Sequence, residues 1–341
     1  MWDRFLRACR RQAVDCTPVW FMRQAGRYMP EYRAVRSKWS LLDICRTPEL
    51  AVEVTLQPLR AFEVDAAILF ADILLPLEPM NAPFDFTQDD GPVIRAPLRN
   101  LADVERLRVF DAEELGHVLT AVRLLRGEID GKTPLIGFAG GPFTMASYLI
   151  EGGRSTHFQR TKRWMHEQPE AWALLMQKLS EVVRRYLRAQ FDAGAQALQI
   201  FDSWAGTLTC ADYAELVAPH LKPLFADLEQ TGVPVIHFSA NGGHLLEQQR
   251  DVGGTVLGIG FQTPLCRAAE QLGPEFALQG NLDPTALLAP RETLKHRVDE
   301  VFEGLGRSTG HIFNLGHGIL PETNPSAVSF VVDRVHARGL S

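Results

Sequence analysis

Eight short apolar runs, each flanked by Gly, Pro or Asp, recur along the 341 residues of this chain. The runs are continuously apolar rather than alternating, which is typical of strands that are buried on both faces, as in parallel sheets. They comprise residues 19–22, 66–70, 134–140, 197–203, 233–239, 255–261, 276–281 and 311–317. Eight such strands alternating with helices predict an α/β fold, a single (β/α)8 TIM barrel. A doubly wound open sheet is the alternative, but no Gly-x-Gly-x-x-Gly follows any run.

Helix signals occupy the segments between the runs. Thr47 is expected to be an N-cap with Pro48 at the first helical position, and a long helix is expected over 166–194, ending at Gly194 as its C-cap. Further helices are predicted over 210–232 and 283–306, and a Pro- and Asp-rich excursion, expected to be a hairpin, over 75–99. No linker, repeat or low-complexity segment divides the chain, so residues 1–341 are predicted to form one domain.

The composition restricts the class of protein. With 46% hydrophobic and 22% charged residues the chain is typical of a soluble globular protein, and its formal net charge of −6 argues against a nucleic-acid or membrane-surface protein. The longest apolar stretch, AAILFADILL, is too short to span a bilayer, and the charged N-terminus lacks the apolar core of a signal peptide. Five scattered cysteines without a Cys-x-x-Cys suit a reduced compartment. A cytoplasmic location is expected.

A local basic segment stands out against this acidic balance. Residues 22–38 carry five cations and one anion, Glu31, for a charge of +4. Arg23 and Arg27 follow the first run directly, where the C-terminal end of a barrel strand would lie. An arginine fork matches a carboxylate or phosphate bidentately, and Gly26 between them allows close backbone approach. The two arginines are interpreted as an anion site, with surface arginines or a structural ion pair as the alternative.

Asp72 interrupts the apolar stretch that follows the second run. A carboxylate there is costly unless something pairs with it. It could pair with an arginine in the core, cap the next turn, or face the N–H groups of a ligand.

Three more polar residues follow predicted strands, and each has a structural alternative. Tyr148 could simply pack its ring and bond its hydroxyl, and Ser203, which lacks a Gly-x-Ser-x-Gly elbow, could be a helix N-cap. His317 lies between two glycines and could act as a proton switch near neutral pH. His237 and His244 have no cysteine or carboxylate at ligand spacing, so no metal site is predicted.

Several long motifs resemble the uroporphyrinogen decarboxylase family, in the right order and over nearly the whole chain. They are PVWFMRQAGRYMPEYR, GFAGGPFTMASYLIEGG, QIFDSWAG, LQGNLDP and FNLGHGILPET. The resemblance implies a single (β/α)8 barrel, a homodimer, and removal of carbon dioxide from the four acetate side chains of uroporphyrinogen III to give coproporphyrinogen III. It also implies that the partner is a tetrapyrrole polycarboxylate and that no metal or organic cofactor takes part.

The same resemblance assigns roles to individual residues. Asp72 and Arg23 would be catalytic, with Asp72 receiving the pyrrole N–H groups at the centre of the macrocycle and stabilising a protonated, cationic ring. Arg23 is one candidate for the proton donor, although arginine is a poor acid, and a water held by Tyr148 or His317 is another. The residues implied in substrate binding are Arg23, Gln24, Ala25, Gly26, Arg27, Asp72, Tyr148, Ser203 and His317.

Departures from the family pattern and two rival interpretations accompany the resemblance. After the sixth run the family usually has a Leu-Asp-Trp-like triplet, whereas this chain has Ile259, Gly260 and Phe261 and so lacks the carboxylate. A zinc-dependent corrinoid or thiol methyltransferase on the same barrel is the nearest rival, but it would need His-x-Cys where this chain has His237 and Ser239. The other rival, a non-catalytic tetrapyrrole carrier, would gain nothing from Asp72.

Overall fold

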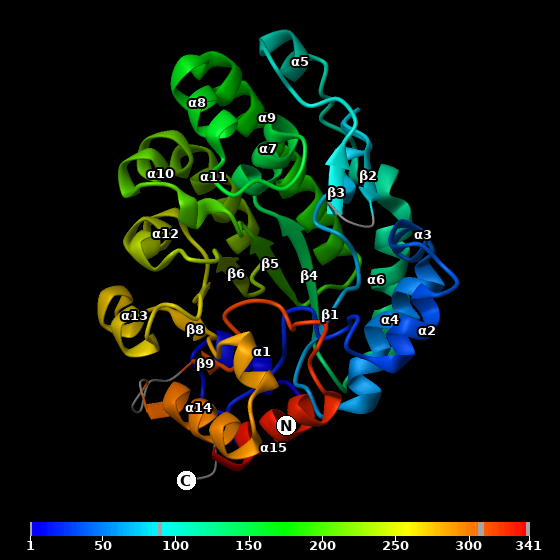
Figure 1. Ribbon diagram of the computed structural model, residues 1–341, viewed down its shortest axis with the longest axis vertical. Helices are drawn as coiled ribbons and strands as arrows, with labels where there is room; N and C mark the ends of the chain where they lie inside the picture. The colour runs from blue at the N-terminus through cyan, green and yellow to red at the C-terminus, as the bar shows by residue number, and fades with distance from the viewer. Residues whose placement is uncertain (1, 88–90, 304, 306–309, 339–341) are drawn as a thin grey trace.

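The centre of the molecule is one parallel sheet of seven strands (Figure 1). This computed structural model describes residues 2–87, 91–303, 305 and 310–338. The strands lie in the order β1 (Ala67–Ile68), β4 (Leu135–Gly140), β5 (Ala197–Phe201), β6 (Val235–Phe238), β7 (Val256–Gly258), β8 (Ala277–Gln279) and β9 (His311–Ile312). Every neighbouring pair is parallel, so the chain returns across the sheet between strands and all carboxyl ends lie at one edge.

The strands overlap the predicted runs, but several are shorter. Run 66–70 contributes only two residues to β1; beyond them the Leu69 amide still donates to the Ile136 carbonyl at 3.1 Å, and the Phe70 amide donates to Thr55 Oγ1 at 2.9 Å. Run 19–22 contributes a single parallel bridge, between Val19 and Phe313. On its other side the Val19 carbonyl accepts from the Asp65 amide at 2.7 Å, just before β1. On the Phe313 side the hydrogen bonds are made by Pro18 and Trp20, so residues 18–20 bond to the chain beside both edge strands of the sheet.

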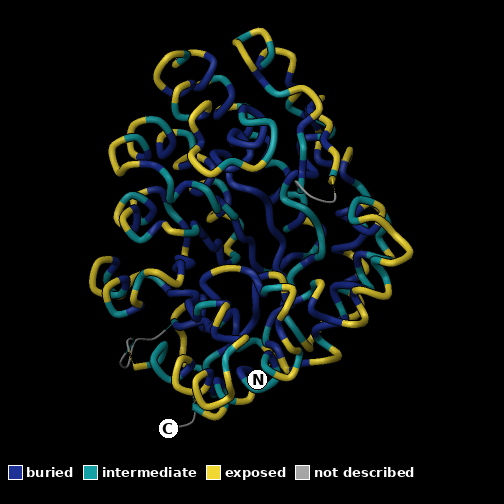
Figure 2. The backbone as a smooth tube through the Cα atoms, viewed as in Figure 1, coloured by how far each residue is buried: buried dark blue, intermediate teal, exposed yellow. Residues whose placement is uncertain are grey.

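Helices surround the sheet (Figure 1), and the burial pattern follows from this arrangement. The strands at the centre are buried, while the outer surfaces of the helices are exposed (Figure 2). All six residues of β4 are buried, as the continuous apolarity predicts. The helices are α1 (Arg4–Cys9), α2 (Pro30–Arg36), α3 (Leu41–Arg46), α4 (Pro48–Ala61), α5 (Leu101–Glu105), α6 (Gly116–Ile129), α7 (Pro142–Glu151), α8 (Gln159–Glu167), α9 (Pro169–Asp192), α10 (Cys210–Leu216), α11 (Ala218–Glu229), α12 (Leu246–Val252), α13 (Leu265–Leu272), α14 (Arg291–Glu303) and α15 (Pro325–Arg338). Among the described residues, none of these helices is long and apolar enough to cross a membrane.

One buried cluster draws a side chain from each of six successive strands. Its members include Ile136, Ala197, Ile236, Val256, Ala277 and Ile312. Because β4 and β9 lie far apart in the strand order, their joint presence indicates that the sheet curls around this cluster. The curl brings the carboxyl ends of distant strands toward one another.

Prolines and caps change the predicted helix boundaries. Pro48 begins α4 as expected and Thr47 has the N-cap position, but the Thr47 side chain makes no capping hydrogen bond. The predicted helix over 166–194 is two helices, α8 and α9, because Pro169 lacks the N–H needed to continue α8. Ala193 is the C-cap of α9, and Gly194 follows it with φ +119°.

The other two predicted helices are also divided. Segment 210–232 forms α10 and α11, and segment 283–306 contains a short 3-10 helix, η5 (Pro284–Leu288), followed by α14. The excursion over 75–99 contains the expected hairpin, made of β2 (Phe84–Thr87) and β3 (Gly91–Ile94).

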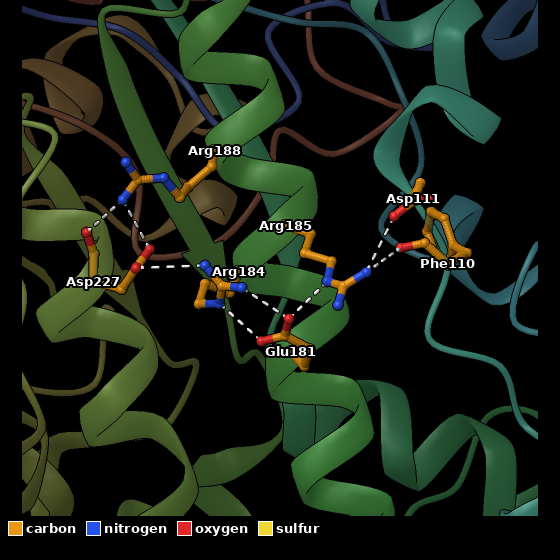
Figure 3. Close-up of polar contacts among 7 residues, drawn as sticks. All are labelled: Phe110, Asp111, Glu181, Arg184, Arg185, Arg188 and Asp227. Atoms are coloured by element: carbon orange, nitrogen blue, oxygen red, sulfur yellow. Dashed lines mark hydrogen bonds and ion pairs between the residues drawn. The ribbon is translucent and has the colours of Figure 1, made fainter.

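Ion pairs tie the long helix α9 to its neighbour α11 (Figure 3). Arg184 and Arg188 of α9 both contact the Asp227 carboxylate, at 3.4 and 3.1 Å. Glu181 accepts hydrogen bonds from Arg184 and from Arg185, which lower its pKa to about 2. These side chains are partly exposed, so each pair adds only about 0.2–1 kcal/mol to stability.

Candidate active site

The first element of the site is the turn that follows Val19. Arg23 adopts a left-handed backbone conformation, φ +61°, which is uncommon outside glycine and costs about 1–3 kcal/mol. Gln24 holds this turn: its side-chain Nε2 donates to the Ala66 carbonyl at 3.1 Å, and its Oε1 accepts from the Phe21 amide at 3.2 Å. The polar atoms of the Gln24 side chain are therefore engaged inside the protein, and the side chain is buried.

The Arg23 side chain extends across Gly318, from the far end of the sequence. A Cβ at Gly318 would collide with the Cγ and Cδ atoms of Arg23, so glycine leaves the space in which this arginine lies. The Arg23 side chain remains accessible, but its surroundings are close enough that burial lowers the pKa of its guanidinium. Arginine nevertheless stays protonated at any ordinary pH.

Asp72 lies four residues beyond β1 and is partly buried. Its Oδ1 accepts a hydrogen bond from the Leu74 amide at 2.9 Å, so the carboxylate caps the following turn, one of the three roles considered for it. Burial raises the pKa of Asp72 to about 6, while the Leu74 amide and the positive charge of Arg23 oppose the rise. Asp72 is thus mainly ionised at pH 7 and lies within electrostatic range of Arg23.

Tyr148 is carried by helix α7, whose first turn is anchored by a buried carboxylate. Asp202, directly after β5, accepts hydrogen bonds at Oδ1 from the Thr144 amide at 2.9 Å and from Thr144 Oγ1 at 2.7 Å. A Cβ at Gly141 would collide with Asp202, so the close approach of strand end and helix start requires glycine. Burial raises the pKa of Asp202 to about 6, and its Oδ2 has no hydrogen-bond partner among the described residues.

The ring of Tyr148 is oriented by Trp204, with ring centroids 4.1 Å apart. The Trp204 amide in turn donates to Thr144 Oγ1 at 3.1 Å. Thr144 therefore connects Asp202, which anchors the first turn of α7, with Trp204, which packs on the Tyr148 ring. Burial raises the pKa of Tyr148 to about 12, and the negative charge of Asp72 contributes. Tyr148 therefore keeps its proton at neutral pH and can donate a hydrogen bond.

His317 lies on an exposed turn between two glycines, beside Arg23. Partial burial and the Arg23 charge lower its pKa, so the imidazole is neutral at pH 7. A Cβ at Gly316 would collide with the Phe261 backbone, which places the Ile259–Phe261 departure against this turn. Ile259 is buried and Phe261 is exposed.

The basic segment is divided between two tasks. Arg27 is exposed, and its charge lowers the pKa of Arg23, so the two guanidinium groups lie within electrostatic range. Arg33 instead donates through Nη1 to the carbonyls of Arg27 and Tyr28, at 2.8 and 2.9 Å, and Arg36 donates to the carbonyl of Trp39. Arg33 therefore stabilises the loop that carries the other two arginines, and Arg36 stabilises the turn after helix α2.

Arg154 joins this group and was not among the predicted site residues. Its charge acts on both Arg23 and Tyr148. We call the group of Arg23, Arg27, Asp72, Tyr148, Arg154 and His317 the arginine–aspartate cluster. The cluster holds three permanent cations against one carboxylate, and such a group is suited to a polyanion.

The remaining predicted site residues lie beside the cluster in the sequence. Ser203 follows β5, partly exposed and adjacent in sequence to Trp204. Ala25 and Gly26, also partly exposed, lie between the two arginines.

The two histidines considered as metal ligands have other surroundings. The His237 ring packs on Phe225 of α11, 4.5 Å between centroids, and burial lowers its pKa to about 4. His244 Nε2 contacts the Leu208 carbonyl at 2.8 Å. Within the described part of the chain, no group of three or more His, Cys, Asp or Glu side chains could hold a metal ion. Two surface hollows, one beside Leu101 and one beside Pro325, include none of the cluster's residues.

Fold and cluster together describe an α/β protein with a curled parallel sheet and a group of cationic side chains around Arg23. Comparison with known proteins gives the family: a model of uroporphyrinogen decarboxylase matches residues 2–338, and the chain belongs to the uroporphyrinogen decarboxylase family. Proteins named uroporphyrinogen decarboxylase from Sorangium cellulosum and Carboxydothermus hydrogenoformans are 63% and 54% identical to it. These alignments cover 99% and 98% of this chain and 97% and 96% of the relatives.

A solved structure of a methyltransferase from Methanosarcina mazei has the same fold. It superposes with a TM-score of 0.80 over 97% of this chain and 96% of its own, at 21% sequence identity. At that identity the likeness describes the fold alone.

Proposed function

We propose that this chain is a decarboxylase that removes the four acetate carboxyl groups of uroporphyrinogen III, leaves methyl groups and gives coproporphyrinogen III in porphyrin and heme biosynthesis. Full-length relatives at 63% and 54% identity carry the name of that enzyme. The observation that supports the proposal in this chain is the arginine–aspartate cluster, in which Arg23 lies within electrostatic range of Arg27, Arg154 and the carboxylate of Asp72.

The two kinds of charge have different tasks in this proposal. Arg23 and Arg27 bind carboxylate side chains of the substrate, since guanidinium forks match carboxylates bidentately. Tyr148 and His317 contribute neutral polar contacts, because the first keeps its proton and the second remains uncharged near pH 7. Ser203 and the backbone from Gln24 to Gly26 complete the proposed binding surface. Asp72 accepts the pyrrole N–H groups.

The proposed chemistry needs no group beyond the substrate and these side chains. Protonation of a pyrrole carbon gives a cationic ring, and the electrons of the breaking bond between methylene and carboxylate flow into that ring as carbon dioxide leaves. A second proton then reaches the methylene carbon and yields the methyl group, and the ring carbon releases the first proton, which restores the neutral pyrrole. An ionised Asp72 near the ring stabilises the cation in surroundings that exclude part of the water, which lowers the barrier. The proton donor is Arg23 or a water molecule held by Tyr148 or His317.

We also propose the finer architecture that the family implies: a closed (β/α)8 barrel in one domain over residues 1–341, acting as a homodimer in the cytoplasm. The hydrogen bonds of residues 18–20, from Pro18 and Trp20 to Phe313 on one side and from Val19 to Asp65 on the other, support closure by an eighth strand. Sedimentation analysis tests the dimer.

The decisive experiment is incubation of the purified chain with reduced uroporphyrinogen III under anaerobic conditions. Chromatography of the oxidised products should resolve porphyrins with seven, six, five and four carboxyl groups, ending in coproporphyrin III. Unchanged substrate at high protein concentration, with binding retained, would instead identify a tetrapyrrole carrier. One tightly bound zinc per chain together with methyl-transfer activity would favour the methyltransferase.

A further inference from the structure

Arg154 belongs to a loop that two different elements hold in place. Helix α7, which carries Tyr148, ends at Gly152 in a left-handed conformation, φ +92°. The Gly152 carbonyl accepts a hydrogen bond from the Ile94 amide of strand β3 at 2.9 Å. The loop is therefore bonded to the β2–β3 hairpin, and the direction in which it leaves α7 is set by the fold.

A glycine of the hairpin makes room for the Arg154 side chain. Gly91, the first residue of β3, has φ +76°, and a Cβ placed on it would lie 2.9 Å from Arg154 Nε and 3.2 Å from Cζ. The guanidinium thus packs directly on the hairpin backbone. This contact restricts a long side chain that would otherwise sample many rotamers, and so reduces the entropy lost when it binds a ligand.

The structure shows no carboxylate paired with Arg154 among the residues that it describes. The charge of Arg154 lowers the pKa values of both Arg23 and Tyr148, so it lies within electrostatic range of each. In the described residues no carboxylate forms an ion pair with Arg154, whereas Arg163 on the next helix pairs with Glu167 at 2.6 Å. Two guanidinium groups that repel each other without a shared partner are stabilised by an anion bound between them.

We propose that Arg154 binds one of the carboxylates at the periphery of the substrate, as a third arginine alongside Arg23 and Arg27. This inference rests on the proposed function, because it assumes a substrate with many carboxylates. It assigns the α7–α8 loop and the hairpin glycine Gly91 to substrate recognition.

The test measures binding of uroporphyrin, the oxidised octacarboxylate macrocycle, by quenching of its fluorescence. Arg154→Ala should weaken binding about three- to tenfold, Arg154→Lys should restore part of it, and the dependence of affinity on salt should become shallower in Arg154→Ala. Arg163→Ala is the matched control, since it removes an exposed arginine nearby that is already paired. In turnover assays KM should rise while kcat stays within about twofold.

Uroporphyrin affinity that is equal in wild type and both Arg154 variants, at low and at high salt, would overturn the inference. A thermal melt of each variant separates loss of binding from loss of fold, and Arg154→Gln serves as a second variant that keeps polarity. Because uroporphyrin is not turned over, the outcomes remain distinct. Wild-type binding without product contradicts the proposed function, whereas normal turnover with an unaffected Arg154→Ala contradicts only the role of Arg154.

Discussion

The exchange of Asp72 for asparagine should stabilise the fold while abolishing most of the activity. Asp72 has a pKa of about 6, above its ordinary value of 3.8, because its carboxylate is partly withdrawn from water. Between these two values the native state holds the proton more tightly than the unfolded state, so the free energy of unfolding falls as the pH rises through this window. At neutral pH the difference corresponds to a cost of about 3 kcal/mol or less.

Asparagine removes that cost and keeps the shape of the side chain. Its amide oxygen can still accept the hydrogen bond that the Leu74 amide donates to Asp72 Oδ1 at 2.9 Å. Asp72→Asn should therefore unfold in urea with a free energy equal to that of the wild type or higher by up to about 3 kcal/mol at pH 7. Turnover should fall about 10²–10³-fold, the usual loss for one preorganised electrostatic contact.

The pH profile gives an independent measurement. In the wild type, kcat/KM should fall about tenfold for each pH unit below about 6, as Asp72 takes up a proton, and this acidic limb should be missing in Asp72→Asn. Asp111→Asn is the control, because the Asp111 side chain is 83% exposed. A variant with wild-type turnover would remove Asp72 from the mechanism. A variant clearly less stable than the wild type would contradict the account of its pKa.

Three further outcomes follow from the same geometry. Gly318→Ala should displace the Arg23 side chain and lower kcat/KM at least about tenfold with little change in the melting temperature; unchanged kinetics would show that Arg23 needs no such space. Thr144→Val should lower the free energy of unfolding by about 1–3 kcal/mol, because buried Asp202 loses the hydroxyl at 2.7 Å, and an unaltered urea midpoint would contradict this. Arg27→Ala should raise KM more than it lowers kcat and reduce the salt dependence of KM; a salt dependence equal to that of the wild type would argue against a carboxylate contact.

The sequence alone determines the positions of the strands and the edge at which the chemistry lies. Residues 134–140 are apolar throughout and residues 233–239 are mainly apolar, and β4 and β6 lie inside them, because burial on both faces leaves no polar alternation. Since parallel strands end at one edge, a polar residue after a strand, such as Asp72, can be placed from its position in the chain. The apolar pattern does not determine strand length, because residues beyond the ladder, such as Phe70, remain partly buried against helices.

Only the tertiary structure decided which charged side chains meet. Arg27 and Arg33 are equally basic members of one segment, yet Arg33 folds back onto backbone carbonyls while Arg27 lies beside Arg23. Arg154 carries no local signal and reaches the cluster because its loop is bonded to a hairpin about 60 residues earlier in the chain. His237 lies within β6, and its ring packs on Phe225 of helix α11. Local sequence patterns indicate burial and periodicity. The direction of a long charged side chain depends instead on backbone carbonyls, glycines and charges that are distant in the sequence and become its neighbours only in the folded protein.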